Sequence, residues 1–308
     1  MKAALLTGHG GPEMLRYGDA PDPTAGPGEV VVDIHAASVN AADYKVRRGG
    51  GAYGNVRFPY ILGRDFSGVI SAVGDGVTDF AVGDAVFGVT EQGIEGAYAE
   101  KIAIKAAIVA RKPDELGHAE AAAMALTGLT ALWAIEDTAR LKRGETILIQ
   151  GGAGGVAGFG IQLAKYLSAT VITTASAGNH SYVRGLGADR VIDYNVEDFT
   201  TAVSNCDVVF DTVGGNVRGG CYAVLKPGGR LVWIAPPPEG FRLPRTDVET
   251  LRPNVMRDRA HLERMLALLD AGAARPPKIV RYKLADASEA HRVSESRHLQ
   301  GKLVFEVR

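Results

Sequence analysis

The sequence predicts an α/β protein in which a β-rich, barrel-like domain precedes a doubly wound parallel sheet. The first observation is a glycine-rich turn between an apolar strand and a helix, where six of the ten residues in 151–160 are glycine. The second is the alternation of strands and helices after residue 145, which is typical of a parallel sheet. The third is a series of short β-branched runs before residue 120, separated by glycine and proline, which is typical of a barrel.

The β-rich domain is expected over residues 1–120. The turns between its apolar runs contain glycine, which adopts positive φ without a steric penalty. The runs are 29–39, 66–73, 84–89 and 98–104. The tail returns to the same character at 278–284 and 301–308, on either side of a helical segment. We therefore expect residues 272–308 to complete this first domain.

The second domain is expected over residues 121–271. An alanine-rich helical stretch opens near His118, and strands then alternate with helices. The expected strands are 145–150, 170–175, 190–194, 206–212 and 230–235, and the expected helices are 156–167, 180–187, 216–225 and 259–271. A turn is expected at Lys226–Gly229. Strands and helices in this order predict βαβ units.

Composition and charge exclude several classes of protein. The 34 basic and 35 acidic residues give a formal charge of −1, which argues against a nucleic-acid or membrane-surface partner. No apolar run approaches the roughly 18 residues of a membrane span. The two cysteines, Cys206 and Cys221, exclude a disulfide framework and favour a reducing cytoplasm. We expect both to pack in the interior, and we expect His291 and His298, on a polar segment, to be solvated.

The glycine-rich turn has the features of a dinucleotide-binding loop. Gly152, Gly154 and Ala157 match the pattern G-x-G-x-x-G/A. Backbone N–H groups at a helix N-terminus bind anions, and glycines let a pyrophosphate approach the backbone. A tight strand–helix turn without a ligand is the alternative. The candidate cofactor contacts are Gly151, Gly152, Ala153, Gly154, Gly155 and Val156.

The end of the second strand indicates which dinucleotide binds. NAD-binding domains carry an acidic residue about 20 positions beyond the glycines, where it binds the ribose 2′-hydroxyl. Segment 173–180 contains no acid, so it tolerates a 2′-phosphate, to which Ser176, Asn179 and His180 could donate. Thr174, in the same strand end, is a further candidate cofactor residue. We expect NADPH; NADH stays possible because the segment contains no lysine or arginine.

Motifs along nearly the whole chain resemble one family. They include SVNAADYKVRRG (38–49), FPYILGRDFSGVI (58–70), ALTGLTALWAI (125–135), LGADRVIDY (186–194), DVVFDTVGG (207–215) and KPGGRLV (226–232). Together they resemble the zinc-independent, zeta-crystallin-like quinone oxidoreductases of the medium-chain dehydrogenase/reductase superfamily. The resemblance implies a GroES-like barrel, a Rossmann domain that binds NADPH, and a homodimer.

The resemblance also implies roles for individual residues. Asn40 and Asp43 match the V-N-x-x-D segment that lines the nicotinamide pocket, and Thr127 matches a threonine near the nicotinamide. Ser176 and Tyr194 match positions that reach the adenosine phosphate. The positions that match strand ends facing the nicotinamide are Val213, Ile234, Ala235 and Pro236.

The residues at the metal positions predict a metal-free protein. The zinc-dependent enzymes that the chain also resembles place a cysteine and a His-Glu pair at the substrate cleft, where this chain has Asn40 and Arg64-Asp65. A structural zinc lobe needs four closely spaced cysteines, and residues 83–112 contain none. We expect Arg64 and Asp65 to replace the metal-binding pair structurally.

A metal-free site restricts the hydride acceptors. Nothing lowers the pKa of an alcohol, so we expect a polarised acceptor such as a quinone or a C=C bond conjugated to a carbonyl. Asn40 and Lys45 are candidate donors to the acceptor oxygen, and Tyr53 is a weaker one. Lys45 could equally be a solvated surface residue. Asp43 is expected to hold local geometry.

The predicted function is NADPH-dependent reduction of a small-molecule quinone. Reduction of an enone (an alkenal or enoyl compound) is the alternative, because the loops 49–57 and 236–252 carry no recognisable pocket pattern. A non-catalytic NADPH-binding protein is a third possibility, which the neutral charge and the intact glycine loop disfavour.

Overall fold

The chain divides into two compact units. The computed structural model describes residues 1–49 and 56–308, so Tyr53 lies outside the described residues. The first unit consists of Met1–Leu126, Arg257–Arg264 and Pro276–Arg308, and the second of Thr127–Met256 and Met265–Arg275. The expected domain limits stay a prediction. Within the described part of the chain, no helix has the length and apolar character needed to span a membrane.

β-strands dominate the first unit, as the sequence predicts. They are β1 (Lys2–Leu6), β2 (Leu15–Asp19), β3 (Glu29–Ser38), β4 (Tyr60–Ile61), β5 (Asp65–Val73), β6 (Ala85–Val89), β7 (Lys101–Lys105), β8 (Val109–Arg111), β15 (Ile279–Lys283) and β16 (Lys302–Glu306). A seven-stranded sheet has the order β15-β16-β3-β5-β6-β8, with β7 paired to β3, and a three-stranded sheet has the order β2-β1-β4. This is the GroES-like barrel that the resemblance implies.

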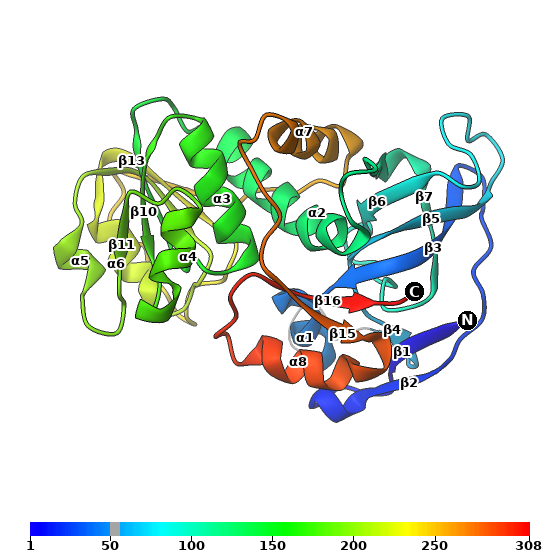
Figure 1. Cartoon of the computed structure of the whole chain (residues 1–308). Coiled ribbons are helices and arrows are strands. Elements are labelled where there is room, and N and C mark those ends of the chain that lie inside the picture. The colour runs from blue at the N-terminus through cyan, green and yellow to red at the C-terminus, as the bar shows by residue number, and fades with distance from the viewer. Residues whose placement is uncertain (50–55) are drawn as a thin grey trace. The chain divides into compact units, whose positions relative to one another are not determined.

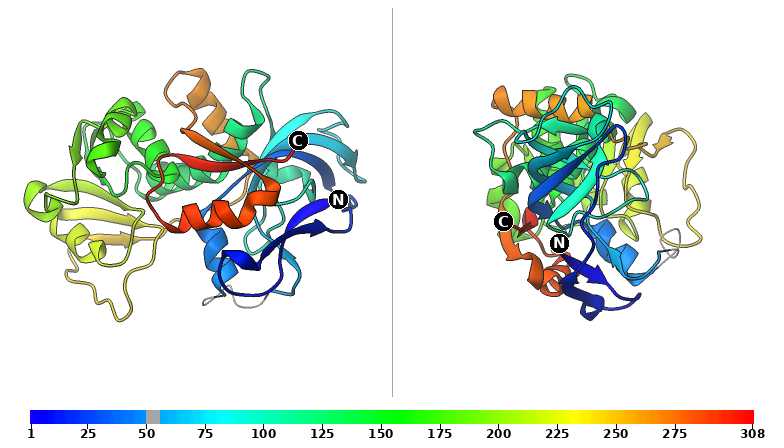
Figure 2. Two further views of the ribbon diagram at one scale, coloured as in Figure 1. Left: turned by 60° about the horizontal axis from the view of Figure 1, so that its bottom comes forward. Right: turned by 90° about the vertical axis from the view of Figure 1, so that its right-hand side faces the viewer.

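The C-terminal tail is part of this unit. β16 pairs antiparallel with β3, with Val304 opposite Ser38, and β15 pairs in parallel with β16. Figures 1 and 2 show the two tail strands (orange and red) together, with β16 next to β3 and β15 beyond it. Helix α8 (Ala287–Glu295) connects β15 to β16, and helix α1 (Ala41–Arg48) follows β3. The pairing therefore brings the start of β16 to the segment between β3 and α1.

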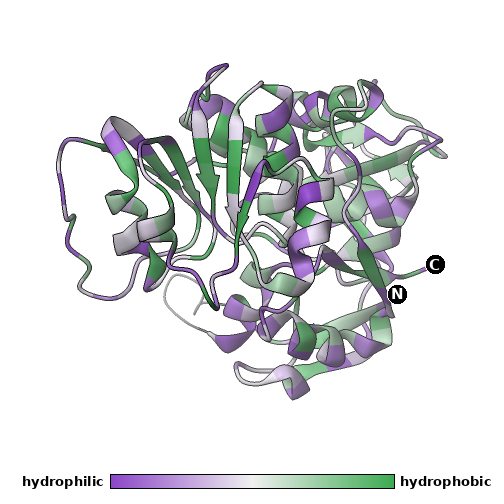
Figure 3. Cartoon of the chain, turned by 60° about the vertical axis from the view of Figure 1, so that its left-hand side comes forward, coloured by the Kyte–Doolittle hydropathy of each residue, from purple (hydrophilic) through white to green (hydrophobic). Residues whose placement is uncertain are grey.

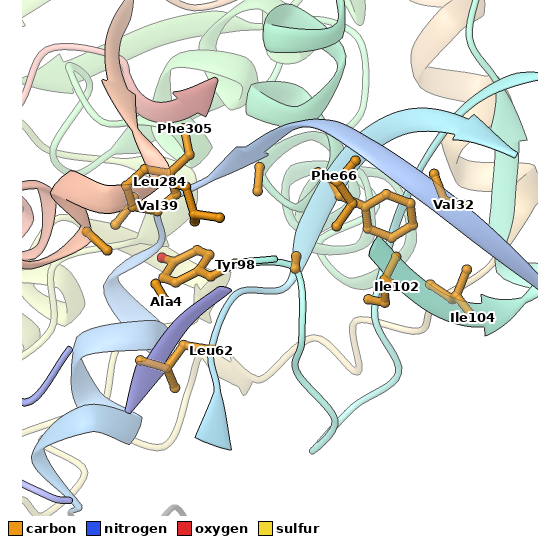
Figure 4. Packing of buried hydrophobic residues seen from close by; sticks show 14 of the residues in the cluster. Ala4, Val32, Val39, Leu62, Phe66, Tyr98, Ile102, Ile104, Leu284 and Phe305 are labelled. Atoms are coloured by element: carbon orange, nitrogen blue, oxygen red, sulfur yellow. The ribbon is translucent and has the colours of Figure 1, made fainter. Parts of the chain in front are cut away.

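An apolar core joins the N-terminal strands to the tail. Figure 4 shows Tyr98 near Ala4 and Leu62 on one side and near Leu284 and Phe305 of the tail on the other. Its ring meets that of Phe305 edge to face, with 4.8 Å between the centroids. Because Tyr98 is fully buried, its hydroxyl requires a partner inside the protein.

The second unit contains a six-stranded parallel sheet in the order β11-β10-β9-β12-β13-β14. Its strands are β9 (Thr146–Ile149), β10 (Thr170–Thr174), β11 (Arg190–Ile192), β12 (Cys206–Asp211), β13 (Leu225–Trp233) and β14 (Glu249–Leu251). Several of them are coloured as hydrophobic in Figure 3, as expected of strands covered on both faces. This is the doubly wound sheet that the sequence predicts.

Helices connect the strands of the second sheet. They are α3 (Gly155–Tyr166), α4 (His180–Gly185), α5 (Phe199–Ala202) and α6 (Val217–Ala223). The limits between the two units fall within or beside α2 (His118–Leu132) and α7 (Arg259–Asp270). Cys206 and Cys221 are buried in one apolar cluster, which confirms that they are packing residues.

Two expectations about this sheet are wrong. The expected turn Lys226–Gly229 lies inside β13. Cys206 and Val208 of β12 pair with Leu225 and Arg230 of β13, so β13 has extra residues at this point and they form a bulge. β14 lies in segment 236–252, which the sequence predicts to be a loop. A three-residue strand is too short for periodicity to reveal, and its pairing with β13 is what forms it.

Candidate functional site

The glycine-rich loop lies where the order of the parallel strands reverses. From β9 the chain continues to β10 and β11 on one side of the sheet, whereas β12, β13 and β14 lie on the other. In such sheets, ligands bind outside the carboxyl ends of the strands at this point. The loop Gln150–Gly154 directly follows β9. The topology therefore places the loop where a ligand is expected.

The loop leaves no room for a side chain at Gly152. Gly151 has a φ of 72°, and its N–H donates to Oγ1 of Thr174 at 3.0 Å. The N–H of Gly152 donates to the carbonyl oxygen of Thr174 at 2.9 Å, and a Cβ on Gly152 would overlap Oγ1 of Thr173. The Thr174 hydroxyl donates to Oε1 of Gln150 at 2.7 Å. Thr174 is thus buried and holds the loop.

The N-terminus of α3 presents backbone donors. Its N-cap is Gly154, which has no capping side chain. The first intrahelical bond runs from the N–H of Gly158 to the oxygen of Gly154 at 2.7 Å. The N–H groups of residues 155–157 have no acceptor within the helix, and the helix dipole favours an anion beside them. The residues present fit the pyrophosphate of a dinucleotide.

Polar groups follow β10, where the sequence predicts the site of the adenosine phosphate. Ser176 accepts a hydrogen bond from Nδ2 of Asn179 at 3.1 Å. Nε2 of His180 lies 3.2 Å from the oxygen of Ala175, so Nε2 carries a proton and donates it. Tyr194 is exposed. Since Nε2 of His180 is engaged, only Nδ1 could donate to a phosphate, and only when the ring is protonated.

In the first unit, Asn40 joins a buried network of charges. Its Nδ2 donates to Oδ1 of Asp65 at 2.9 Å and to the oxygen of Ser38 at 3.4 Å. Its Oδ1 accepts a hydrogen bond from the ammonium of Lys302 at 2.6 Å. Lys302 also donates to the oxygen of Val39 at 2.8 Å. Lys302, the first residue of β16, was missed as a candidate.

Burial acts on both charges of this network. Desolvation lowers the pKa of Lys302, and the carboxylates of Asp65 and Asp43 oppose this effect. Desolvation also raises the pKa of Asp65, while Lys302, Ser38 and Asn40 oppose it. Each charge therefore depends on the other, because neither has water to replace its partner.

Asp43 belongs to a second buried chain of hydrogen bonds. Its Oδ2 accepts the Tyr98 hydroxyl at 2.6 Å and the N–H of Asn40 at 2.8 Å. The Tyr98 oxygen lies 3.3 Å from Nε2 of His291, whose Nδ1 accepts from Nε of Arg47 at 3.2 Å. The expectation that His291 is solvated is wrong, because the ring is fully buried. Its partners lie far away in sequence.

The surroundings of Asp43 and His291 favour their neutral forms. Desolvation, with Glu95 as a second cause, raises the pKa of Asp43 to about 7, although Arg64 and Tyr98 oppose the shift. Desolvation, followed by the charge of Arg47, lowers the pKa of His291 to about 3. By accepting the N–H of Asn40, Asp43 caps the start of α1, which is consistent with the structural role expected of it.

Arg64 pairs with two acids, Glu95 and Asp43. Its Nη2 lies 2.9 Å from Oε1 of Glu95, and its Nε lies 3.7 Å from Oδ1 of Asp43. Lys45 lies on α1 and is half-buried. Desolvation lowers its pKa, and the nearby charges of Arg297 and Arg64 lower it further. Lys45 is therefore not a fully solvated lysine. Thr127 is buried in α2, in the second unit, and its role stays a prediction.

The residues at the metal positions do not fit a catalytic zinc ion. Over residues 1–49 and 56–308, no three His, Cys, Asp or Glu side chains gather as metal ligands. The oxygen of Asn40 already accepts from the Lys302 ammonium. A divalent ion beside a buried ammonium would be repelled. Lys302 thus places a buried cation beside Asn40 and Asp65, and the structural role expected of Arg64 and Asp65 stays a prediction.

The barrel and the dinucleotide loop define an NAD(P)H-dependent oxidoreductase. The alcohol dehydrogenase GroES-like domain family matches residues 26–114, and the zinc-binding dehydrogenase family matches residues 186–305. The chloroplast envelope quinone oxidoreductase homolog of Arabidopsis thaliana is 31% identical over 96% of this chain and 95% of its own length. The chain belongs to the zinc-independent quinone oxidoreductase family of the medium-chain dehydrogenase/reductase superfamily.

Two further relatives inform the choice of substrate and cofactor. The chloroplastic NADPH-dependent alkenal/one oxidoreductase of Arabidopsis thaliana is 32% identical over 99% of this chain and 79% of its own length. The crystal structure of Escherichia coli quinone oxidoreductase complexed with NADPH is 27% identical, covers all of both chains and has a TM-score of 0.92.

Proposed function

We propose that this protein transfers a hydride from NADPH to a quinone without a metal ion. The observation that carries the proposal is the Lys302 ammonium, which binds Asn40 at a position where related enzymes hold zinc. An ammonium that is already engaged with Asn40 and Val39 does not coordinate an alcohol oxygen and lower its pKa. A quinone needs no such activation, because its own carbonyl groups polarise the ring.

The chain's own residues bind the cofactor in this proposal. NADPH supplies the hydride. The backbone N–H groups at the start of α3 hold the pyrophosphate, and Ser176, Asn179 and Tyr194 hold the phosphate on the adenosine. The absence of an acid in segment 173–180 supports NADPH over NADH, as does the NADPH bound to the Escherichia coli relative. Val213 and Ile234–Pro236 face the nicotinamide.

Lys45 is the proposed donor to the acceptor oxygen. Among the described residues, its ammonium has no hydrogen-bond or ion-pair partner. Its lowered pKa makes it a better proton donor than an ordinary lysine. Both N–H groups of the Asn40 amide are engaged with Asp65 and Ser38, so Asn40 acts as a positioning residue. Lys45 is thus free to meet negative charge on the acceptor.

The proposal includes a homodimer in the cytoplasm that acts on a small molecule. The family resemblance supports the dimer, and the two buried cysteines suit a reducing compartment. Neither feature is needed for the hydride transfer.

The first test follows NADPH absorbance with a panel of quinones, enones and, as a control, simple ketones. We expect oxidation with quinones, no oxidation with ketones, and unchanged rates after dialysis against a chelator. Consumption of NADPH by enones alone would favour the second candidate, which the alkenal/one oxidoreductase relative supports. Absence of oxidation with every acceptor, together with tight NADPH binding, would leave a non-catalytic binding protein. Stoichiometric zinc in elemental analysis would contradict the metal-free mechanism.

The second test replaces Lys45 with methionine, which keeps the stem and removes the donor. We expect kcat to fall by up to about 10²-fold, as for other lost oxyanion donors, while NADPH affinity is unchanged. Lys105→Met is the matched control, because Lys105 is exposed and pairs with Glu91 at the surface. Steady-state kinetics with one quinone measure both variants. A kcat within twofold of the wild type for Lys45→Met would remove Lys45 from the mechanism.

A further inference from the structure

A buried ion pair joins two turns at the carboxyl edge of the parallel sheet. Asp211 ends β12 and Arg218 lies in α6; their side chains are 0% and 2% exposed, and Nε of Arg218 donates to Oδ2 of Asp211 at 2.6 Å. Oδ1 of Asp211 accepts the N–H groups of Val213 at 3.0 Å and Gly214 at 2.8 Å. Nη2 of Arg218 donates to the oxygen of Ala235 at 2.6 Å. One ion pair therefore fixes the backbone after β12 and after β13.

The first of these turns lies against the glycine-rich loop. The Thr212 hydroxyl donates to the oxygen of Gln150 at 2.7 Å. A Cβ on Gly151 would lie 3.0 Å from Cγ2 of Val213. Val213 is nevertheless 42% exposed. The turn thus presents an apolar side chain at the strand-order reversal, where the topology places a ligand.

The ion pair between Asp211 and Arg218 fixes the orientation of its neighbours, which apolar packing would not do. Desolvation of two buried charges often cancels their attraction, so apolar residues of similar size can stabilise a fold equally well. The geometry of a guanidinium and a carboxylate is directional, however, and here it sets two backbone segments relative to each other. Arg218 also lies over the Trp233 ring, 4.9 Å from its centroid, which limits its rotation.

We propose that Asp211 and Arg218 are positioning residues that orient the nicotinamide half of the cofactor. The inference rests on the proposed function. The pair holds Val213 and Ala235 in place, and these residues seat the ring from which the hydride leaves. The adenosine half is held elsewhere, by the residues that follow β10. Loss of the pair should therefore affect the two halves of NADPH differently.

The test compares NADPH with 2′,5′-ADP, which contains only the adenosine half and its 2′-phosphate. Three variants are used: Arg218→Met, Arg218→Lys, and the double variant Asp211→Asn/Arg218→Met. The double variant leaves no unpaired charge in the interior, and the asparagine oxygen still accepts the N–H of Val213. Calorimetry measures the Kd of each ligand, and single-turnover kinetics at saturating NADPH measure hydride transfer to a quinone.

We expect Arg218→Met and the double variant to raise the Kd of NADPH about tenfold. A shift of the ring by about 1 Å should slow hydride transfer by about 10²-fold. The Kd of 2′,5′-ADP should stay within about twofold, because the variants leave the adenosine half untouched. Arg218→Lys should recover part of the rate, since it keeps the charge but not the fork of donors.

Arg230→Met is the matched control. Nη2 of Arg230 lies 2.6 Å from Oε1 of Glu145 in a partly buried pair of the same sheet, ahead of β9 and so at the opposite edge. This variant should lower the melting temperature and leave both Kd values unchanged. If the Arg218 variants weaken both ligands equally, or change neither ligand nor the rate, the inference is overturned. A wild-type protein that binds neither ligand overturns the proposed function and this inference with it.

Discussion

The two candidate regions, the network around Asn40 in the first unit and the glycine-rich loop in the second, are built in opposite ways. The network around Asn40 contains two buried charged side chains, and burial shifts the pKa values of both Lys302 and Asp65. The glycine-rich loop uses backbone N–H groups and small residues, without a capping side chain. The difference follows from the charge that each region must neutralise. A dinucleotide brings its own charge to a neutral loop, whereas a barrel that lacks the metal contains its own cation.

The largest effect is expected from removing that cation. Lys302→Met leaves Asp65 buried without its countercharge, which should lower the free energy of unfolding by about 3–5 kcal/mol. The double variant Lys302→Met/Asp65→Asn should recover more than half of the loss, because no isolated charge remains. Urea unfolding measures all three proteins. A loss below about 1 kcal/mol for the single variant would show that the charge of Lys302 stabilises the buried Asp65 no more than a surface ion pair would.

The titration of Asp43 should make the stability of the charged network depend on pH, unlike that of the glycine-rich loop. Burial raises its pKa from 3.8 to about 7, so the folded protein keeps this proton to a higher pH than the unfolded chain does. The stability that Asp43 contributes is therefore complete below pH 3.8 and is lost as the pH rises through about 7. Asp43 should contribute a loss of about 1.4 kcal/mol in the free energy of unfolding for each pH unit between these two pKa values. In Asp43→Asn this contribution should be absent, so the stability of the variant should fall less steeply with pH than that of the wild type.

Urea unfolding between about pH 4.5 and 7.5 measures this difference. The asparagine oxygen still accepts from Tyr98 and from the N–H of Asn40, so the hydrogen bonds survive in the variant. Asp198→Asn is the control. Asp198 is exposed at the N-cap of α5, and hydrogen bonds from the Thr200 N–H and hydroxyl lower its pKa, so its carboxylate stays charged over this pH range. If the free energy of unfolding changes with pH equally in Asp43→Asn and in the wild type, Asp43 does not hold the proton whose loss destabilises the protein.

The glycine-rich loop should respond to volume rather than to charge. In Gly152→Ala the added Cβ meets Thr173, which is buried and bonded to Ile149. We expect a loss of about 1–3 kcal/mol in stability and weaker NADPH binding. Gly219→Ala is the control, because Gly219 lies in α6 with open space around its Cβ position. Thermal unfolding measures the stability of both variants, and NADPH titration measures their affinity. Equal losses in Gly152→Ala and Gly219→Ala would contradict tight packing around Gly152.

The smallest effect concerns the choice between cofactors. Ser176→Asp places a carboxylate where the 2′-phosphate is proposed to lie, so it should reduce the preference for NADPH over NADH by about fivefold or more. The affinity for NADH should change little. Fluorescence titration of both nucleotides measures the ratio. A wild type that already binds NADH equally well would show that the missing basic residue after β10 decides the cofactor.

Local patterns predicted most of the fold. β9 and α3 lie within one residue of the expected limits at each end, because an apolar run and a glycine turn are properties of neighbouring residues. β14 and the bulge in β13 were missed, since both arise from pairing with another strand. His291 was misjudged for a similar reason: its segment is polar, and its burial depends on Arg47 and Tyr98.

The sequence by itself determined the two-part architecture, the dinucleotide loop, the family and the absence of the usual metal ligands. Only the tertiary structure decided what stands in their place. Lys302 lies 262 positions from Asn40, and it reaches that amide because β16 pairs with β3. The link from Arg218 to Ala235 likewise depends on two adjacent strands ending together. A sequence states which residues can carry charge, but the partner of a buried charge is set by strand register, which local patterns do not encode.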